Sequence, residues 1–359
     1  MAGPSSLPAR ACGCDRPALL RRMDHDARVN GAVIARAPLR IALGGGGTDL
    51  LSHYREHGGF VLSCAIDRYV RMRVSPASGE LFRLAHLEHE EVLDPADIEH
   101  PILRAAITRH GDGRPLELSS EGDVPPGTGL GSSGAYAVCA VKAIGLSAAR
   151  ELTGGELAEA ACAIEIEDAG RTVGKQDQYA STHGGVNSFT FARDGAVEVH
   201  RHDLPPQIRE ALRDRFLLFY TGQSRSAAHI LSDQVDRTLA GDSELERNLL
   251  RTSAAARESS RAVEAGDLEA IAELMNEQWA LKRERLARVA MPRIEELREV
   301  AFRGGARAAM LMGAGGGGYL LAYAPEPEPV RTALAGAGAP ELTFDLDVEG
   351  CVGRRATAD

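Results

Sequence analysis

Three glycine-rich segments contain residues whose types and spacing could do chemistry. They cover residues 44–48, 127–134 and 313–318, and the middle one lies in the run PPGTGLGSSGA. Its glycines permit positive φ angles and close approach of a ligand. Ser132 and Ser133 then open an Ala-rich stretch with the composition of a helix. Unpaired amides at a helix N-terminus and serine hydroxyls can bind phosphate. A tight turn with a serine cap accounts for the same letters equally well.

Two established nucleotide-binding patterns fit these segments poorly. The chain has no GxxxxGK[ST], so it is not a P-loop NTPase of the usual kind. GLGSSG (129–134) has the letters of GxGxxG, but it follows two prolines instead of a strand. GAGGGG (313–318) has them too, yet the YLLAY that follows it is typical of a strand, not a helix. A dinucleotide-dependent dehydrogenase is therefore disfavoured.

The composition narrows the classes of partner. The chain has 359 residues, a formal net charge of −10 and 4% aromatic residues. Such a chain is not expected to bind nucleic acid or an anionic membrane surface. No apolar run approaches the roughly 20 residues that span a bilayer, and the N-terminus lacks a hydrophobic signal region. These features predict a cytoplasmic protein that acts on small molecules.

The cysteines predict a reducing compartment. The six residues show neither a disulfide framework nor a zinc pattern. Cys139 and Cys162 sit among Ala and Val and are expected to be buried thiols.

Strand and helix patterns occur in both halves of the chain without regular alternation, which predicts an α+β fold. A hairpin is expected over 186–200, turning at Asp194-Gly195. The other expected strands cover 33–35, 39–43, parts of 60–74, 81–86, 216–220, 308–312, 319–323 and 342–348. The expected helices cover 132–150, 155–169, 243–265, 267–288 and 293–303.

Leu204-Pro205-Pro206 is the best candidate for a domain boundary. We expect a disordered extension over 1–31, domains over 32–205 and 206–352, and a tail over 353–359. The helices at 243–303 could form a homodimer interface or cover their own sheet, and the sequence leaves the oligomeric state open.

The glycine motifs, taken in order, resemble those of the GHMP kinase family, which includes galactokinase, homoserine kinase and mevalonate kinase. The motifs are RAPLRIALGGGGTDL, PPGTGLGSSGA and GAGGGGY, and the resemblance covers about 33–350. GKQDQYASTHGGVNSF, FYTGQSRSAAHIL and QWALKRERL further resemble the D-glycero-D-manno-heptose 7-phosphate kinases of that family. L-fucokinases share much of this wording.

The resemblance implies a two-domain fold: an N-terminal α/β domain with a left-handed βαβ unit, and a C-terminal ferredoxin-like domain. It also implies ATP and Mg²⁺ as the co-substrate and cofactor. The implied reaction phosphorylates the anomeric hydroxyl of the heptose 7-phosphate to give the 1,7-bisphosphate. The alternatives are a kinase for an unphosphorylated sugar, similar to L-fucokinase or galactokinase, and a non-catalytic sugar or nucleotide sensor.

The resemblance also carries site residues onto this chain. Asp177 would lie beside the acceptor hydroxyl, with Arg40 as its partner, and positioning would carry much of the rate. Ser133 and Glu165 would hold Mg²⁺, although Glu165 could equally be a surface charge. The ATP loop would consist of Pro126, Gly127, Gly129, Leu130, Gly131, Ser132, Ser133 and Gly134.

The sugar would be held by Asp49 in the GGGGTDL motif. The tract before it and the third motif would shape the site through Gly45, Gly46, Gly47, Thr48, Gly315 and Gly316. A substrate phosphate needs cations, and the candidates are Lys175, Arg225 and Lys282, with Arg171 and Arg68 as weaker ones. One departure puts the sugar in doubt: related heptose kinases carry a lysine shortly before the third motif, where this chain has Ala308-Ala309-Met310.

Overall fold

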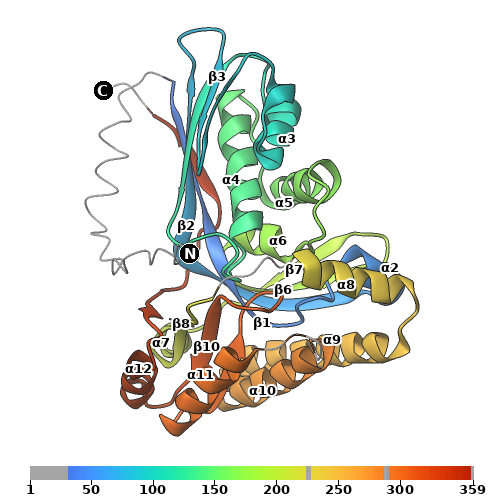
Figure 1. Cartoon of the computed structure of the whole chain (residues 1–359), viewed down its shortest axis with the longest axis vertical. Helices are drawn as coiled ribbons and strands as arrows, with labels where there is room; N and C mark the ends of the chain where they lie inside the picture. The colour runs from blue at the N-terminus through green and yellow to red at the C-terminus, as the bar shows by residue number, and fades with distance from the viewer. Residues whose placement is uncertain (1–30, 224–227, 287–288, 290, 357–359) are drawn as a thin grey trace, which may run out of the picture.

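Two β-sheets, each covered by helices, organise the chain (Figure 1). The computed structural model describes residues 31–223, 228–286, 289 and 291–356. Nearly all of the extension expected over 1–31 therefore lies outside the described residues, and so does Arg225.

The first sheet is built around a long antiparallel pair, β1 (Val33–Gly44) and β2 (Gly59–Pro76). At the start of β1, the buried Val33 and Ala35 alternate with the half-buried Ile34 and Arg36. Toward its end the strand is buried on both faces. One half of β2 pairs with β5 and the other half with β6, so the β1–β2 ribbon runs through most of the molecule. The remaining strands of this sheet are β3 (Phe82–Ala85), β4 (His89–Val92), β5 (Leu116–Gly122), β6 (Val186–Phe191), β7 (Val197–Arg201) and β12 (Val352–Arg355).

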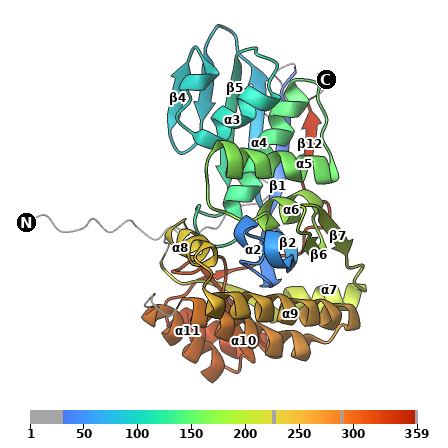
Figure 2. The ribbon, with the colours of Figure 1, turned by 90° about the vertical axis from the view of Figure 1, so that its right-hand side faces the viewer.

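Helices cover one face of this sheet (Figures 1 and 2). The central one, α4 (Ser132–Ser147), is Ala- and Val-rich and is buried along most of its length. The region expected as one helix over 155–169 is instead α5 (Gly154–Cys162) followed by a π-helical turn, η3 (Ala163–Asp168). The other helical elements of this half are α2 (Leu51–His57), η2 (Pro95–Asp97), α3 (Pro101–His110) and α6 (Gln176–His183).

The second domain confirms the expected ferredoxin-like topology. Its four antiparallel strands lie in the order β11-β8-β10-β9, and helices connect β8 to β9 and β10 to β11. This is the β-α-β-β-α-β arrangement. The strands are β8 (Phe216–Tyr220), β9 (Ala308–Leu311), β10 (Tyr319–Tyr323) and β11 (Glu341–Leu342). The helices are α7 (Pro206–Arg215), α8 (Ala228–Leu239), α9 (Ser243–Ala265), α10 (Leu268–Arg285), α11 (Pro292–Arg303) and α12 (Pro327–Gly336).

Helices α9 and α10 form an antiparallel hairpin that turns at Gly266, with Asp267 capping α10. They pack against each other, against β9 and against the ends of β1 and β2 (Figure 2). The helices over 243–303 therefore cover sheets of their own chain.

The strand expected over 342–348 is wrong, because the chain crosses between the two sheets there. Only Glu341–Leu342 pairs with β8. Leu346 then forms an isolated bridge with Ile66, and the Asp347 carboxylate accepts from the Gly350 amide at 2.7 Å. After this turn β12 pairs with β1. Residues 353–355, expected as part of a tail, thus belong to the first sheet.

Among the described residues, no helix has the length and apolar character needed to cross a bilayer. The thiols of Cys139 and Cys162 are free and buried, as expected from their apolar neighbours.

Candidate functional site

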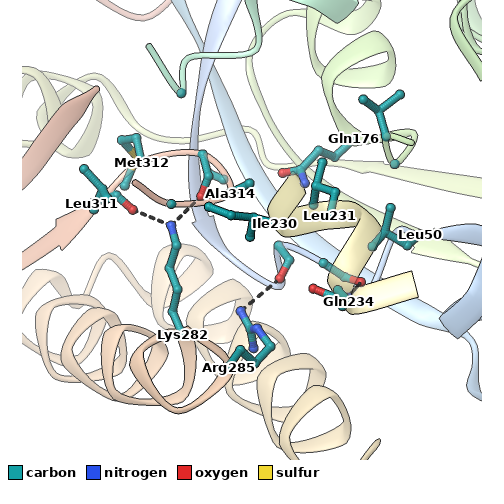
Figure 3. Close-up of a pocket in the computed structure, with 18 of the residues that line it drawn as sticks. Leu50, Gln176, Ile230, Leu231, Gln234, Lys282, Arg285, Leu311, Met312 and Ala314 are labelled. Atoms are coloured by element: carbon teal, nitrogen blue, oxygen red, sulfur yellow. Dashed lines mark hydrogen bonds between the residues drawn. The ribbon is translucent and has the colours of Figure 1, made fainter. Parts of the chain in front are cut away.

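A cavity of about 440 Å³ lies where the three glycine-rich segments meet α6, α8 and α10 (Figure 3). Its wall contains residues from both domains, which are far apart in the sequence. Twelve of the residues expected for the site line it: Arg40, Gly46, Gly47, Asp49, Gly127, Gly129, Gly131, Ser132, Ser133, Asp177, Lys282 and Gly315.

The loop before α4 has the geometry of a phosphate site. Gly127, Gly129 and Gly131 all have positive φ angles, which only glycine adopts readily. The first helical hydrogen bond runs from the Ala135 amide to the Gly131 carbonyl, so the amides of residues 132–134 precede it. Together with the serine hydroxyls, these amides can bind an anionic oxygen.

The third glycine-rich segment packs directly on this loop. A Cβ atom on Gly129 would lie 2.6 Å from the Met312 carbonyl oxygen, and one on Gly318 would lie 2.2 Å from that of Thr128. Backbone therefore touches backbone, and side chains cannot be inserted. Gly315 lines the cavity, whereas Gly316 is buried behind it.

The structure brings Arg40 and Asp177 together in the wall of the cavity. The Arg40 Nε donates to Asp177 Oδ1 at 2.8 Å, and a terminal guanidinium nitrogen lies 2.6 Å from the same oxygen. The other guanidinium nitrogen donates to the Gly129 carbonyl at 2.6 Å. The Arg40 amide donates to the Leu130 carbonyl, so Leu130 is a buried anchor of the loop and does not line the cavity. Pro126 is exposed outside it.

Glu165 lies behind Ser133, with 1% of its surface exposed. The Ser133 hydroxyl donates to Glu165 Oε1, and the Gln178 amide donates to Oε2 at 2.8 Å. Arg171 donates to the Ser133 oxygen at 2.6 Å. Burial raises the pKa of Glu165, and the nearby Asp177 raises it further. A buried carboxylate next to a hydroxyl is an oxygen-donor pair suited to a hard cation such as Mg²⁺.

Asp49 also lines the cavity and is held in a fixed orientation. Its carboxylate accepts from the backbone N–H groups of Gly47 and Gln176, both at 3.1 Å. A Cβ atom on Gly174 would lie 1.9 Å from Asp49 Oδ2, so only glycine fits there. Burial raises the pKa of Asp49. The carboxylate can still accept from ligand hydroxyls on the cavity side.

Two residues of the tract before Asp49 have structural contacts instead of lining the cavity. The Thr48 hydroxyl donates to the carbonyls of Gly45 and Phe60 at 2.7 and 3.0 Å. A Cβ atom on Gly45 would lie 2.0 Å from the Phe60 oxygen. These contacts fix the turn that presents Gly46 and Gly47.

Two cations from α10, Lys282 and Arg285, also line the cavity (Figure 3). The Lys282 ammonium donates to the carbonyl of Leu311 at 2.7 Å and to that of Gly313. Burial, with the fields of Arg285 and Arg40, lowers the pKa of Lys282 to about 7. Arg285 lies one turn further along and was missed in the sequence. Its spacing of three residues from Lys282 within QWALKRERL was the available signal.

The buried Lys282 predicts a pH dependence of stability. Between about pH 7 and about pH 10 the unfolded chain binds more protons at this residue than the folded one. The free energy of unfolding of the wild type should therefore rise relative to that of Lys282→Met across this range. Chemical denaturation of both proteins measures the difference, and a difference that stays constant with pH would contradict the lowered pKa.

The remaining cations expected for a substrate phosphate lie elsewhere. The Lys175 ammonium pairs with Glu159 at 2.8 Å and donates to the Gly195 carbonyl, so it points away from the cavity. Arg68 pairs with Asp67 next to it. Arg171 contacts Ser133 and Glu165 from the solvent side.

Three glutamines of the cavity wall, Gln176, Gln234 and Gln278, were also missed. The side-chain amide of Gln234 donates to the Gly47 carbonyl at 2.9 Å. The side-chain amide of Gln278 donates to the Thr252 carbonyl at 3.0 Å. Gln234 lies on α8, which the sequence patterns did not predict, so nothing in the sequence indicated its place.

Comparisons with known proteins agree with this geometry. Two family models match in chain order: the GHMP kinases N terminal domain over residues 100–185 and the GHMP kinases C terminal domain over residues 259–339. A D-glycero-alpha-D-manno-heptose 7-phosphate kinase from Campylobacter jejuni is 29% identical over 304 residues, which are 80% of this chain and 88% of that protein. A bifunctional fucokinase/GDP-fucose pyrophosphorylase from Arabidopsis thaliana is 26% identical over 80% of this chain and 29% of its own.

Solved structures show the same fold. A D-glycero-D-manno-heptose 1-phosphate kinase from Bacteriodes thetaiotaomicron has a TM-score of 0.74 at 23% identity, covering 90% of this chain and 98% of its own. A Lactococcus lactis galactokinase complexed with galactose has a TM-score of 0.72 at 17% identity, and the match covers 94% of this chain and 99% of that one. Both family domains, the fold and the order of the glycine motifs thus agree, and the chain belongs to the GHMP kinase family.

Proposed function

We propose that this kinase transfers the γ-phosphoryl group of ATP to the anomeric hydroxyl of D-glycero-D-manno-heptose 7-phosphate, giving the 1,7-bisphosphate. The observation that carries the proposal is the Arg40–Asp177 pair, which lies directly beside the N-terminus of α4 in the wall of one cavity. This arrangement supplies a proton acceptor, a fixed positive charge and a phosphate site within reach of one another.

In the proposed reaction the sugar hydroxyl oxygen forms a bond to the γ-phosphorus, and the bond from that phosphorus to the bridging oxygen of ADP breaks. The hydroxyl proton passes to the Asp177 carboxylate. Arg40 contacts Oδ1, so Oδ2 is the oxygen that can accept this proton. The amides of residues 132–134 hold phosphate oxygens, while Asp49 orients neighbouring sugar hydroxyls.

Mg²⁺ would be held by Glu165 and Ser133 together with oxygens of ATP, and it would supply charge neutralisation on the phosphates. The buried Glu165 carboxylate favours this assignment. Its partners are a serine and a glutamine at hydrogen-bond distance, and Arg171 lies 3.7 Å away. A cation would offset the cost of burying its charge.

Glu165→Gln tests the metal assignment. Turnover should fall about 100-fold or more, because an oxygen ligand and its charge are lost. Burial raises the pKa of Glu165, so its charged form destabilises the folded protein near neutral pH. The variant should therefore unfold at the same or a higher temperature in the absence of nucleotide.

Glu167→Gln is the matched control, because its side chain is 69% exposed two residues away. ADP release measured against Mg²⁺ concentration, with thermal unfolding, separates the two effects. An unchanged Mg²⁺ dependence in Glu165→Gln would remove this residue from the metal site.

The choice of sugar rests on the relatives together with the cavity. The C. jejuni relative is named for a heptose 7-phosphate, and this cavity carries Lys282 and Arg285 on one wall. The Arabidopsis relative, named in part as a fucokinase, supports the second candidate, a kinase for an unphosphorylated sugar.

An ADP-release assay over a sugar panel tests the proposal. The panel contains heptose 7-phosphate, the unphosphorylated heptose, L-fucose and D-galactose, with product mass and anomeric phosphorus NMR as readouts. We expect turnover of the heptose 7-phosphate and a new phosphate at the anomeric carbon. Turnover of a free sugar alone would favour the second candidate, and no ADP release with any sugar would indicate a sensor.

A further inference from the structure

Arg285 is a cation of the cavity wall that donates hydrogen bonds to three neutral groups. Its guanidinium donates to the Asn248 side-chain oxygen at 2.8 Å and to the Thr252 hydroxyl at 2.7 Å. It also donates to the Gly46 carbonyl at 3.3 Å (Figure 3). The carboxylate nearest in sequence, Glu284, instead accepts from the Asn248 amide at 2.7 Å and lies 3.6 Å from Arg251. Among the described residues, no carboxylate therefore forms an ion pair with Arg285, and Glu284 acts on it only through its field.

Helix α9 holds this guanidinium in one orientation. The Asn248 amide nitrogen donates to the Leu281 carbonyl at 3.0 Å, which turns its oxygen toward Arg285. The Thr252 hydroxyl donates to the Asn248 carbonyl at 2.9 Å and accepts from Arg285. Two neutral acceptors therefore position a planar group that can bind a phosphate through two parallel hydrogen bonds.

Arg40, Lys282 and Arg285 lie at different places in the cavity wall. Arg237 also lines the cavity, but it pairs with Asp242 at 2.8 Å. Lys282 lies within the fields of both Arg40 and Arg285. Arg40 is neutralised by Asp177, and Arg285 touches the Gly46 turn on the side of Asp49. Arg285 thus contacts the Gly46 turn, whereas the Arg40–Asp177 pair contacts the phosphate loop through Gly129 and Gly131.

Uncompensated positive charge in a largely desolvated cavity is costly unless a ligand supplies the opposite charge. Burial lowers the pKa of Arg285 to about 10, which reflects this cost. The chain as a whole carries a net charge of −10, so the positive wall is a local feature of the cavity. A neutral side chain could hold the Gly46 carbonyl without that cost.

We propose that Arg285, oriented by Asn248 and Thr252, binds the phosphate group that the sugar substrate already carries, and so selects phosphorylated over unphosphorylated sugars. This inference rests on the proposed function. It also accounts for the absence of a lysine at 308–310, since α10 brings cations to the same cavity that Met310 lines.

The test compares wild type, Arg285→Met, Arg285→Lys and the control Arg283→Met. Arg283 lies on the same helix, pairs with Glu295 at 2.6 Å and is absent from the cavity wall. For Arg285→Met, kcat/KM for heptose 7-phosphate should fall about 100-fold, mainly through KM, while that for unphosphorylated heptose stays within about threefold. Arg285→Lys should recover part of the loss, and Arg283→Met should leave both sugars unaffected.

Calorimetric titration of both sugars into protein saturated with Mg²⁺ and a non-hydrolysable ATP analogue separates this inference from the proposed function. The inference holds if wild type binds heptose 7-phosphate more tightly than heptose and Arg285→Met loses this preference. It then holds even where the new phosphate appears on another hydroxyl. Equal losses for both sugars would assign Arg285 a structural role at Gly46. Equal affinity of wild type for both sugars would also overturn the inference.

Discussion

Replacing Asp177 with asparagine is expected to lower kcat about 1,000-fold, within the range known for loss of a general base. Asparagine keeps the shape of the side chain, but it cannot accept the proton of the sugar hydroxyl or pair with Arg40. The amides of residues 132–134 are unaffected, so the affinity for a non-hydrolysable ATP analogue should remain within about threefold. Steady-state ADP release and calorimetric titration measure the two quantities.

Asp203→Asn is the control for this change, because its side chain is 95% exposed. It should have the turnover and stability of the wild type. Activity of Asp177→Asn within about tenfold of the wild type would show that the reaction does not depend on this carboxylate. Loss of nucleotide binding in the variant would point to a structural role instead.

Replacing Gly134 with alanine is expected to reduce kcat about 100-fold and to destabilise the fold by about 1–3 kcal/mol. A Cβ atom there would lie 2.5 Å from the Cβ of Asp177 and 3.0 Å from the Gln178 amide nitrogen. The added methyl group must push α6 away from α4 or distort both helices. Asp177 would then move relative to the phosphate loop, and a displacement of about 1 Å is enough to cost this much rate.

Gly155→Ala is the matched control, since it also places alanine in a helix, and nothing lies within 4 Å of the added Cβ. Its stability should be unchanged or slightly higher, because alanine favours helix. Thermal unfolding and ADP release check both variants. A Gly134→Ala protein with wild-type turnover would mean that α4 and α6 can separate without displacing Asp177.

The long amphipathic or Ala-rich helices were predictable because their residue patterns carry the signal. The structure places α9 at the residues expected for it and begins α4 at Ser132. Helix α6 was not predicted, since its eight residues are polar or small and show little apolar periodicity. The region 342–348 has strand-like residues, but its partners change from β8 to Ile66 within a few positions. Such a crossing depends on where two sheets lie in space.

The local geometry of the glycine-rich segments could be predicted from the sequence alone, because it depends on the backbone. Positive φ angles and backbone contacts admit only glycine, so the letters report the local geometry. The cations of the cavity could not be sorted in this way. Lys175 and Lys282 look alike in the sequence, yet Lys175 pairs with Glu159 outside the cavity, whereas Lys282 lies inside it beside Arg285. A long side chain can reach several neighbours, and only the packing of α10 and α6 against the two sheets decides which of them it meets.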